Sequence, residues 1–178
     1  IGLSDPDDLY HKMTEVFTWD ALKRTDWLVD YQNYYTFCGV MSQRLLFVNA
    51  AKEMLKVGDK DRALELLNRC QECVPRENFP LDMSWMGFSN ELMVLEMISL
   101  YYYSGDADSA RALAADFSEE LISASVFYAE FYDYCKREFD SERMVIASLV
   151  DMLMEEGDGE LAKNIESSFK LALGVEDR

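Results

Sequence analysis

Three Gly-Asp dipeptides, each followed by an Ala at the same offset, constrain the fold of this chain more than any other feature. The three segments read GDKDRALELLNRC, GDADSARALAADF and GDGELAKNIESSF, starting at Gly58, Gly105 and Gly157. Each follows an apolar run with the spacing of one helix face. Gly tolerates the left-handed conformation that ends a helix, and Asp caps the helix that follows. The pattern therefore predicts an internal repeat of antiparallel helix pairs.

Close packing of the two helices explains why the repeat has an alanine at this position. The alanines are Ala63, Ala110 and Ala162, each in the first turns of the second helix of a pair. Helices joined by a very short turn lie close together, and a small side chain permits the interaxial distance of about 8–10 Å found in tight packing. A Leu there would overpack the contact, at a cost of about 1–3 kcal/mol. These glycines and alanines are the predicted structural positions of the repeat.

The composition agrees with a helical fold and excludes some partners. Of the 178 residues 49% are apolar, whereas only 3 are Pro and 8 are Gly. The 17 basic and 34 acidic residues give a net charge of −17, which repels nucleic acid and disfavours an anionic membrane surface. No apolar stretch is long enough to span a bilayer. The charge serves solubility, or it offers a docking surface to a basic partner.

The expected architecture is a tetratricopeptide-like right-handed solenoid of about eight antiparallel helices. Asp5 and Pro6 begin a first helix that runs to about Phe17. The first helix of the second pair is expected near Ser84, after a loop that begins at Pro75. We predict one domain over residues 1–178. It is divided into an N-terminal helix and connector (1–31), a first helix pair (32–75), a second pair (84–122) and a last part (123–178). The last part holds the remainder of an additional helix, which runs from 118 to 139, and a third pair that begins at Ser141.

The segment from Arg44 to Pro75 resembles a tetratricopeptide repeat. Ala51 stands at the small position of its first helix, Ala63 at the alanine of its second helix and Pro75 at the closing proline. The other two pairs match less closely, because Ile98 and Val150 replace the small residue and no proline follows.

Most of the chain also resembles the soluble C-terminal region of a bacterial family of multi-span membrane proteins, which carries a domain of unknown function and is related to protein O-mannosyltransferases. About two thirds of the chain matches well and the last third by pattern only. Asp20 departs from the family, which has a glycine there. The matching residues are Leu9, Tyr10, Met13, Phe17 and Trp19, then Val29 to Asn33, then Arg44 and Phe47, then Gly58, Ala63, Leu67, Cys70 and Pro75, and finally Pro80.

The resemblance implies a parent protein of the inner membrane, with this chain on the periplasmic side. Catalysis in such proteins resides in the membrane part, so no catalytic residue is carried over to this chain. The implied partner is a protein or glycoprotein, or the membrane portion of the parent chain. The start at Ile1 rather than Met fits the expectation that further sequence precedes it.

Residue types that form catalytic, redox or metal sites in other proteins have structural interpretations in this chain. Cys70 and Cys73 form a C-x-x-C at the end of a helix, where the dipole does not favour a thiolate, and no second pair completes a zinc site. His11 is the single histidine of the chain. Neighbouring carboxylates, such as Glu119 and Glu120, point apart on a helix rather than across a cleft. We therefore predict no catalytic residue, no metal and no cofactor.

Aromatic residues near the start offer the best candidates for a binding patch. Trp19, Tyr31 and Tyr34 lie in or beside an irregular connector, where side chains for recognition often occur. Two other functions stay open. One is a nutrient- or glycan-binding surface protein built on tetratricopeptide-like helices. The other is a helical enzyme whose site, including His11, has no recognised motif.

Overall fold

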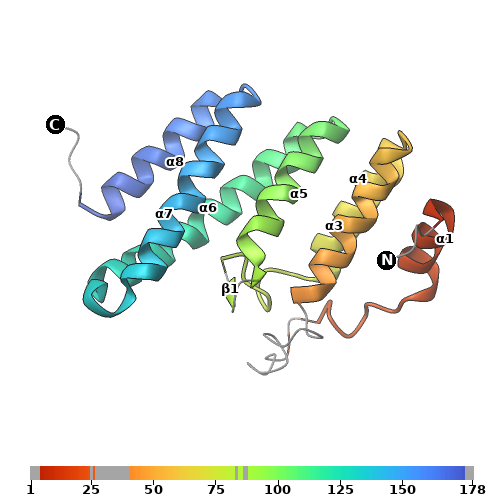
Figure 1. Ribbon diagram of the computed structural model, residues 1–178, viewed down its shortest axis with the longest axis horizontal. Coiled ribbons are helices and arrows are strands. Elements are labelled where there is room, and N and C mark those ends of the chain that lie inside the picture. The colour runs from red at the N-terminus through yellow and green to blue at the C-terminus, as the bar shows by residue number, and fades with distance from the viewer. Residues whose placement is uncertain (1–4, 25, 27–40, 83, 86–87, 175–178) are drawn as a thin grey trace. The chain divides into compact units, whose positions relative to one another are not determined.

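The computed structural model describes residues 5–24, 26, 41–82, 84–85 and 88–174. Within these ranges the chain is almost entirely helical, with seven α-helices, one π-helical turn and one pairing of two-residue strands (Figure 1). The predicted all-α class is confirmed. The chain divides into two compact units, Ile1–Asp106 and Ala107–Arg178. The predicted second helix pair, over 84–122, therefore straddles the boundary between the units.

The first unit begins with α1 (Pro6–His11), which continues as a π-helical turn, η1 (Lys12–Val16). The Oδ1 atom of Asp5 accepts a hydrogen bond of 3.0 Å from the amide of Asp7, so Asp5 caps the helix as the sequence indicates. The helical segment ends at Phe17, which is extended. Met13 is the buried residue of this segment.

Helices α3 (Met41–Lys56) and α4 (Lys60–Cys73) pack against each other and are joined by the first Gly-Asp turn. Gly58 has a φ of +82°, a conformation that residues with a Cβ rarely adopt. The Oδ1 atom of Asp59 accepts from the amide of Arg62 at 3.1 Å and caps α4. The predicted first helix of this pair starts at Gln32, and its part before Met41 lies outside the described residues.

The helix expected near Ser84 begins later, at Asn90. Residues Ser84–Trp85 (β1) and Phe88–Ser89 (β2) instead pair as antiparallel strands, and α5 covers Asn90–Ser104. The side chain of Asn90, the first residue of α5, donates to the carbonyl oxygens of Pro80 and Leu81 at 3.1 and 2.9 Å and ties the start of the helix to the preceding loop. Helix α5 packs against both α3 and α4.

The second unit consists of α6 (Ala107–Glu130), α7 (Tyr132–Glu155) and α8 (Gly159–Ala172). The separate helix predicted from Ser118 to Phe139 is wrong, because non-helical backbone interrupts it at Phe131, with φ −111° and ψ 33°, and again at Cys135, with φ −115° and ψ 24°. Its first half belongs to α6 and its second half to α7. Ser141, predicted to start a helix, lies inside α7. Helix α6 packs against both α7 and α8.

The glycines of the repeat share a positive φ, and its alanines share full burial, in all three places. Gly105 and Gly157 also have positive φ, at +100° and +88°. Ala63, Ala110 and Ala162 are fully buried. The third turn differs in its cap: the carboxylate of Asp158 accepts from Nη1 of Arg111, at 3.2 Å from each oxygen, rather than from an amide of α8.

Candidate binding surface

The predicted aromatic patch near the N-terminus does not form around Trp19. Its side chain is only 6% exposed, its Nε1–H donates to the carbonyl oxygen of Met13 at 3.0 Å, and its ring lies 4.7 Å from that of Phe47. Trp19 is thus a core residue that fastens the N-terminal segment to α3. Tyr31 and Tyr34 lie outside the described residues.

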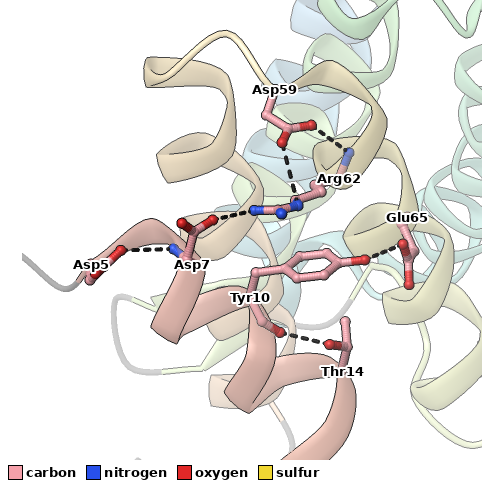
Figure 2. A network of polar contacts seen from close by, with 7 residues as sticks. All are labelled: Asp5, Asp7, Tyr10, Thr14, Asp59, Arg62 and Glu65. Carbon is pink, nitrogen blue, oxygen red and sulfur yellow. Dashed lines mark hydrogen bonds and ion pairs between the residues drawn. The ribbon is translucent and has the colours of Figure 1, made fainter.

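A polar network holds α1 on α4 (Figure 2). Arg62 of α4 pairs with Asp7 of α1 and with Asp59, and its guanidinium lies 4.8 Å from the ring centroid of Tyr10. The hydroxyl of Tyr10 donates to Glu65. Desolvation and the hydrogen bond to Glu65 raise the pKa of Tyr10 to about 12, so its hydroxyl stays protonated. The network fastens the two helices to each other.

The candidates for catalytic chemistry from the sequence lie apart. His11 is exposed and its Nδ1 is 3.3 Å from a carboxylate oxygen of Glu15. Cys70 and Cys73 are buried free thiols. Desolvation by burial raises the pKa of Cys70 to about 12, which makes it a poor nucleophile at neutral pH. No group of three or more potential metal ligands occurs in the part of the chain that the structure describes.

A hollow lies in the second unit, between α7 and α8, and we call it the α7–α8 groove. It has a volume of about 760 Å³. Apolar side chains form most of it, and four charged side chains stand at its rim. The lining residues from α7 are Phe139, Arg143, Ile146, Ala147, Val150, Asp151 and Met154, and those from α8 and its C-terminal cap are Glu166, Phe169, Lys170 and Leu173.

A cluster of aromatic side chains surrounds the reversal between α6 and α7, and we call it the aromatic tip. It consists of Phe127, Tyr128, Phe131, Tyr132, Tyr134 and Phe139. The ring centroids of Phe127 and Phe131 are 5.1 Å apart, and those of Tyr132 and Phe139 are 5.6 Å apart. These rings are nevertheless accessible: Phe131 is 48% exposed and Tyr134 is 89% exposed.

Phe139 joins the two features into one surface. It belongs to the aromatic tip through its contact with Tyr132, and it also lines the α7–α8 groove. At the opposite end of the groove, Met154 is 52% exposed. The sequence carries Tyr128, Phe131, Tyr132 and Phe139 at helical spacing, but the spacing alone does not tell whether these rings are packed or exposed.

A smaller hollow of about 350 Å³ lies between α3 and α5 and is bordered by Lys52, Lys56 and Tyr103. Both of its lysines are already engaged. Lys52 pairs with Glu96 of α5, and Lys56 pairs with Glu53 of its own helix at 2.6 Å. The α7–α8 groove is therefore the better candidate for binding.

Comparisons with known protein families, with curated proteins and with solved structures find no match to this chain. Among the described helices, none combines the length and the apolar character needed to cross a membrane.

Proposed function

We propose that this chain is a non-catalytic protein-interaction or scaffold domain that binds its partner through the α7–α8 groove and the aromatic tip. One observation carries the proposal: an apolar groove adjoins exposed aromatic and Met side chains on a chain whose net charge is −17. A soluble chain rarely exposes such a surface unless something covers it. Phe, Tyr and Met, which supply much of it, are enriched at protein interfaces.

We further propose that the helix pairs form a tetratricopeptide-like right-handed solenoid. Two features support this. The three Gly-Asp turns share a positive φ and a buried Ala, and within each unit a third helix packs on a helical pair. An experimental structure in which the pairs of the two units do not stack in succession would contradict the solenoid.

The resemblance to the membrane-protein family leads us to propose that the chain is the periplasmic C-terminal region of a membrane-bound, glycosyltransferase-like protein. The residues that carry the resemblance have structural roles here: Met13, Trp19 and Phe47 pack together, and Arg44 is buried. A structural use of these positions fits a support domain. The proposal predicts membrane spans upstream of Ile1, so the gene sequence there tests it. A lipoprotein signal would favour the nutrient-binding alternative instead.

Partner capture tests the interaction function. The immobilised domain, offered to a membrane extract of the parent organism, should retain a specific protein that quantitative mass spectrometry identifies. The surface variant Phe131→Ser/Tyr134→Ser/Met154→Glu should retain at least ten times less of it. All three side chains are about half exposed or more, so the fold should survive the changes.

The matched control is Val16→Ser/Leu46→Ser/Val57→Ser, which removes three exposed apolar side chains from the first unit. It should retain the partner as well as the unmodified chain does. Equal retention by the surface variant and by the unmodified chain would overturn the proposed function.

A further inference from the structure

We infer that the α7–α8 groove seats one amphipathic helix of a partner protein, oriented so that a basic N-terminal end lies over the acidic residues around Gly157. The inference rests on the proposed function and names the kind of partner. Three kinds of observation carry it: the shape of the groove, the packing of helices within each unit, and the distribution of charge along α7.

The shape of the groove fits a helix. Ile146, Val150 and Met154 are spaced four residues apart and form one row along α7. Phe169 and Leu173, also four apart, form the facing row along α8. From Phe139 to Met154, α7 rises by about 22 Å, which is the length of four helical turns. A trough between two parallel rows of apolar side chains accepts a helix with its own apolar stripe.

The described helices of the second unit leave this trough open. Helix α6 packs against the α7–α8 pair, and the apolar side chains that α7 buries are Val145, Ile146, Leu149 and Leu153, so Ile146 lines the groove as a buried side chain. The groove residues Val150 and Met154 each follow one of these core residues, about 100° further around the helix. The first unit shows how a third helix completes a pair, since α5 lies against both α3 and α4.

The charges along α7 give the helix a direction. At the end near Gly157, Asp151, Glu155 and Glu156 are exposed carboxylates, and no basic residue pairs with them within the described ranges. At the other end, Lys136, Arg137 and Arg143 alternate with acidic residues. A helix N-terminus, with its positive dipole end and any Lys or Arg nearby, is therefore favoured next to Glu155 and Glu156. The partner helix then runs antiparallel to α7.

A second copy of this chain is a poorer occupant. Residues 107–174 contain 15 acidic and 6 basic side chains, so two such units repel each other. A partner with a basic helix instead neutralises part of the net negative charge of residues 107–174 when it binds.

Synthetic peptides test the inference on the full chain. The probe is a 16-residue fluorescent peptide with one Leu stripe at helical spacing and four Lys in its first two turns. Two isomers serve as comparisons: one has the Lys in the last two turns, and one has Glu in place of Lys. Fluorescence anisotropy at two salt concentrations gives the affinities. We expect the N-terminally basic peptide to bind at least tenfold more tightly than the Glu peptide and several-fold more tightly than the reversed isomer.

Three protein variants locate the site. Val150→Asp should weaken binding of the N-terminally basic peptide at least tenfold, and Glu155→Lys/Glu156→Lys should remove its advantage over the reversed isomer. The control Glu72→Lys/Glu77→Lys makes the same change in net charge, but at exposed residues of the first unit. It should leave the advantage of the N-terminally basic peptide intact. Equal weakening by both charge variants would mean unspecific attraction and would overturn the inference.

The inference and the proposed function can fail separately. If none of the peptides binds, while partner capture still depends on Phe131, Tyr134 and Met154, the helical occupant is wrong and the interaction function stands. If sedimentation shows a dimer that Val150→Asp dissociates, the occupant is a second copy and the inference is overturned.

Discussion

The guanidinium of Arg44 donates to the side-chain oxygen of Asn90 at 3.1 Å, and both side chains are buried. The same guanidinium also donates to the carbonyl oxygens of Val74, Phe79 and Pro80. Together the two side chains satisfy the backbone of the loop between α4 and α5. Buried carbonyl groups need such partners, because an unsatisfied one costs about 1–3 kcal/mol.

Replacing Arg44 by Met should therefore lower the free energy of unfolding by about 3–5 kcal/mol, since it leaves several buried acceptors unpaired at once. Chemical denaturation followed by circular dichroism measures the loss. The control is Arg24→Met, which removes an exposed arginine that pairs with Asp26. Such a surface pair contributes at most about 1 kcal/mol. Similar losses for both variants would show that Arg44 does not hold the loop.

The three buried alanines should not tolerate a larger side chain. Each Ala→Leu change at residues 63, 110 and 162 should cost about 1–3 kcal/mol, because the neighbouring helix must move away. The triple variant should therefore be largely unfolded at 25 °C, as circular dichroism would show. The matched triple Ala112→Leu/Ala115→Leu/Ala172→Leu uses exposed positions and should melt close to the unmodified chain. A normal melting temperature for the buried triple would refute the paired-helix interpretation.

Stability should fall as the pH rises above 8.5, and Cys70 should account for part of the fall. Burial raises the pKa of Cys70 to about 12, whereas a thiol in an unfolded chain has a pKa of about 8.5. Between these values the unfolded chain gives up the proton and the folded chain keeps it, so rising pH favours unfolding. The slope is at most about 1.4 kcal/mol per pH unit for this group.

Urea unfolding at pH 8 and pH 10 measures this effect. The unmodified chain should lose about 2 kcal/mol more than Cys70→Ala does over this interval. Burial also raises the pKa of Cys73, and Cys73→Ala serves as the comparison for the second thiol. Parallel pH profiles for the unmodified chain and Cys70→Ala would show that the Cys70 thiol ionises alike in both states.

The sequence predicts the ends of helices where a residue type enforces them. A positive φ favours Gly over other residues, so the Gly-Asp turns could be predicted. An Asp cap followed by Pro is typical of a helix N-terminus, so the start of α1 could be predicted from Asp5 and Pro6. The reversal at Phe131 carries no Gly or Pro and could not be found. There the aromatic contacts between the ends of α6 and α7, such as Phe127 with Phe131, accompany the turn. Such contacts depend on tertiary packing rather than on local propensity.

The candidate site was harder to predict than the fold. Ile146, Val150 and Phe169 belong to ordinary amphipathic faces, and the pattern does not tell whether another helix covers them. Trp19 shows the opposite error. Its place in a connector suggested exposure, but Phe47, which is distant in sequence, buries its ring.

Trp19 should therefore contribute far more to stability than the hydrogen bond from Tyr10 to Glu65 that Figure 2 shows. Trp19→Ala removes a buried ring that packs on Phe47 and leaves the carbonyl of Met13 without its donor, so a loss of about 3–5 kcal/mol is expected. Tyr10→Phe removes only the hydrogen bond to Glu65, which is worth about 1 kcal/mol or less because Glu65 is exposed. Thermal unfolding of the two variants beside Trp19→Phe, which keeps an aromatic ring, compares these contributions. Trp19→Phe should lie between them. If Trp19→Ala melts like Tyr10→Phe, the N-terminal segment is held by its polar contacts, and the ring of Trp19 is dispensable for the first unit.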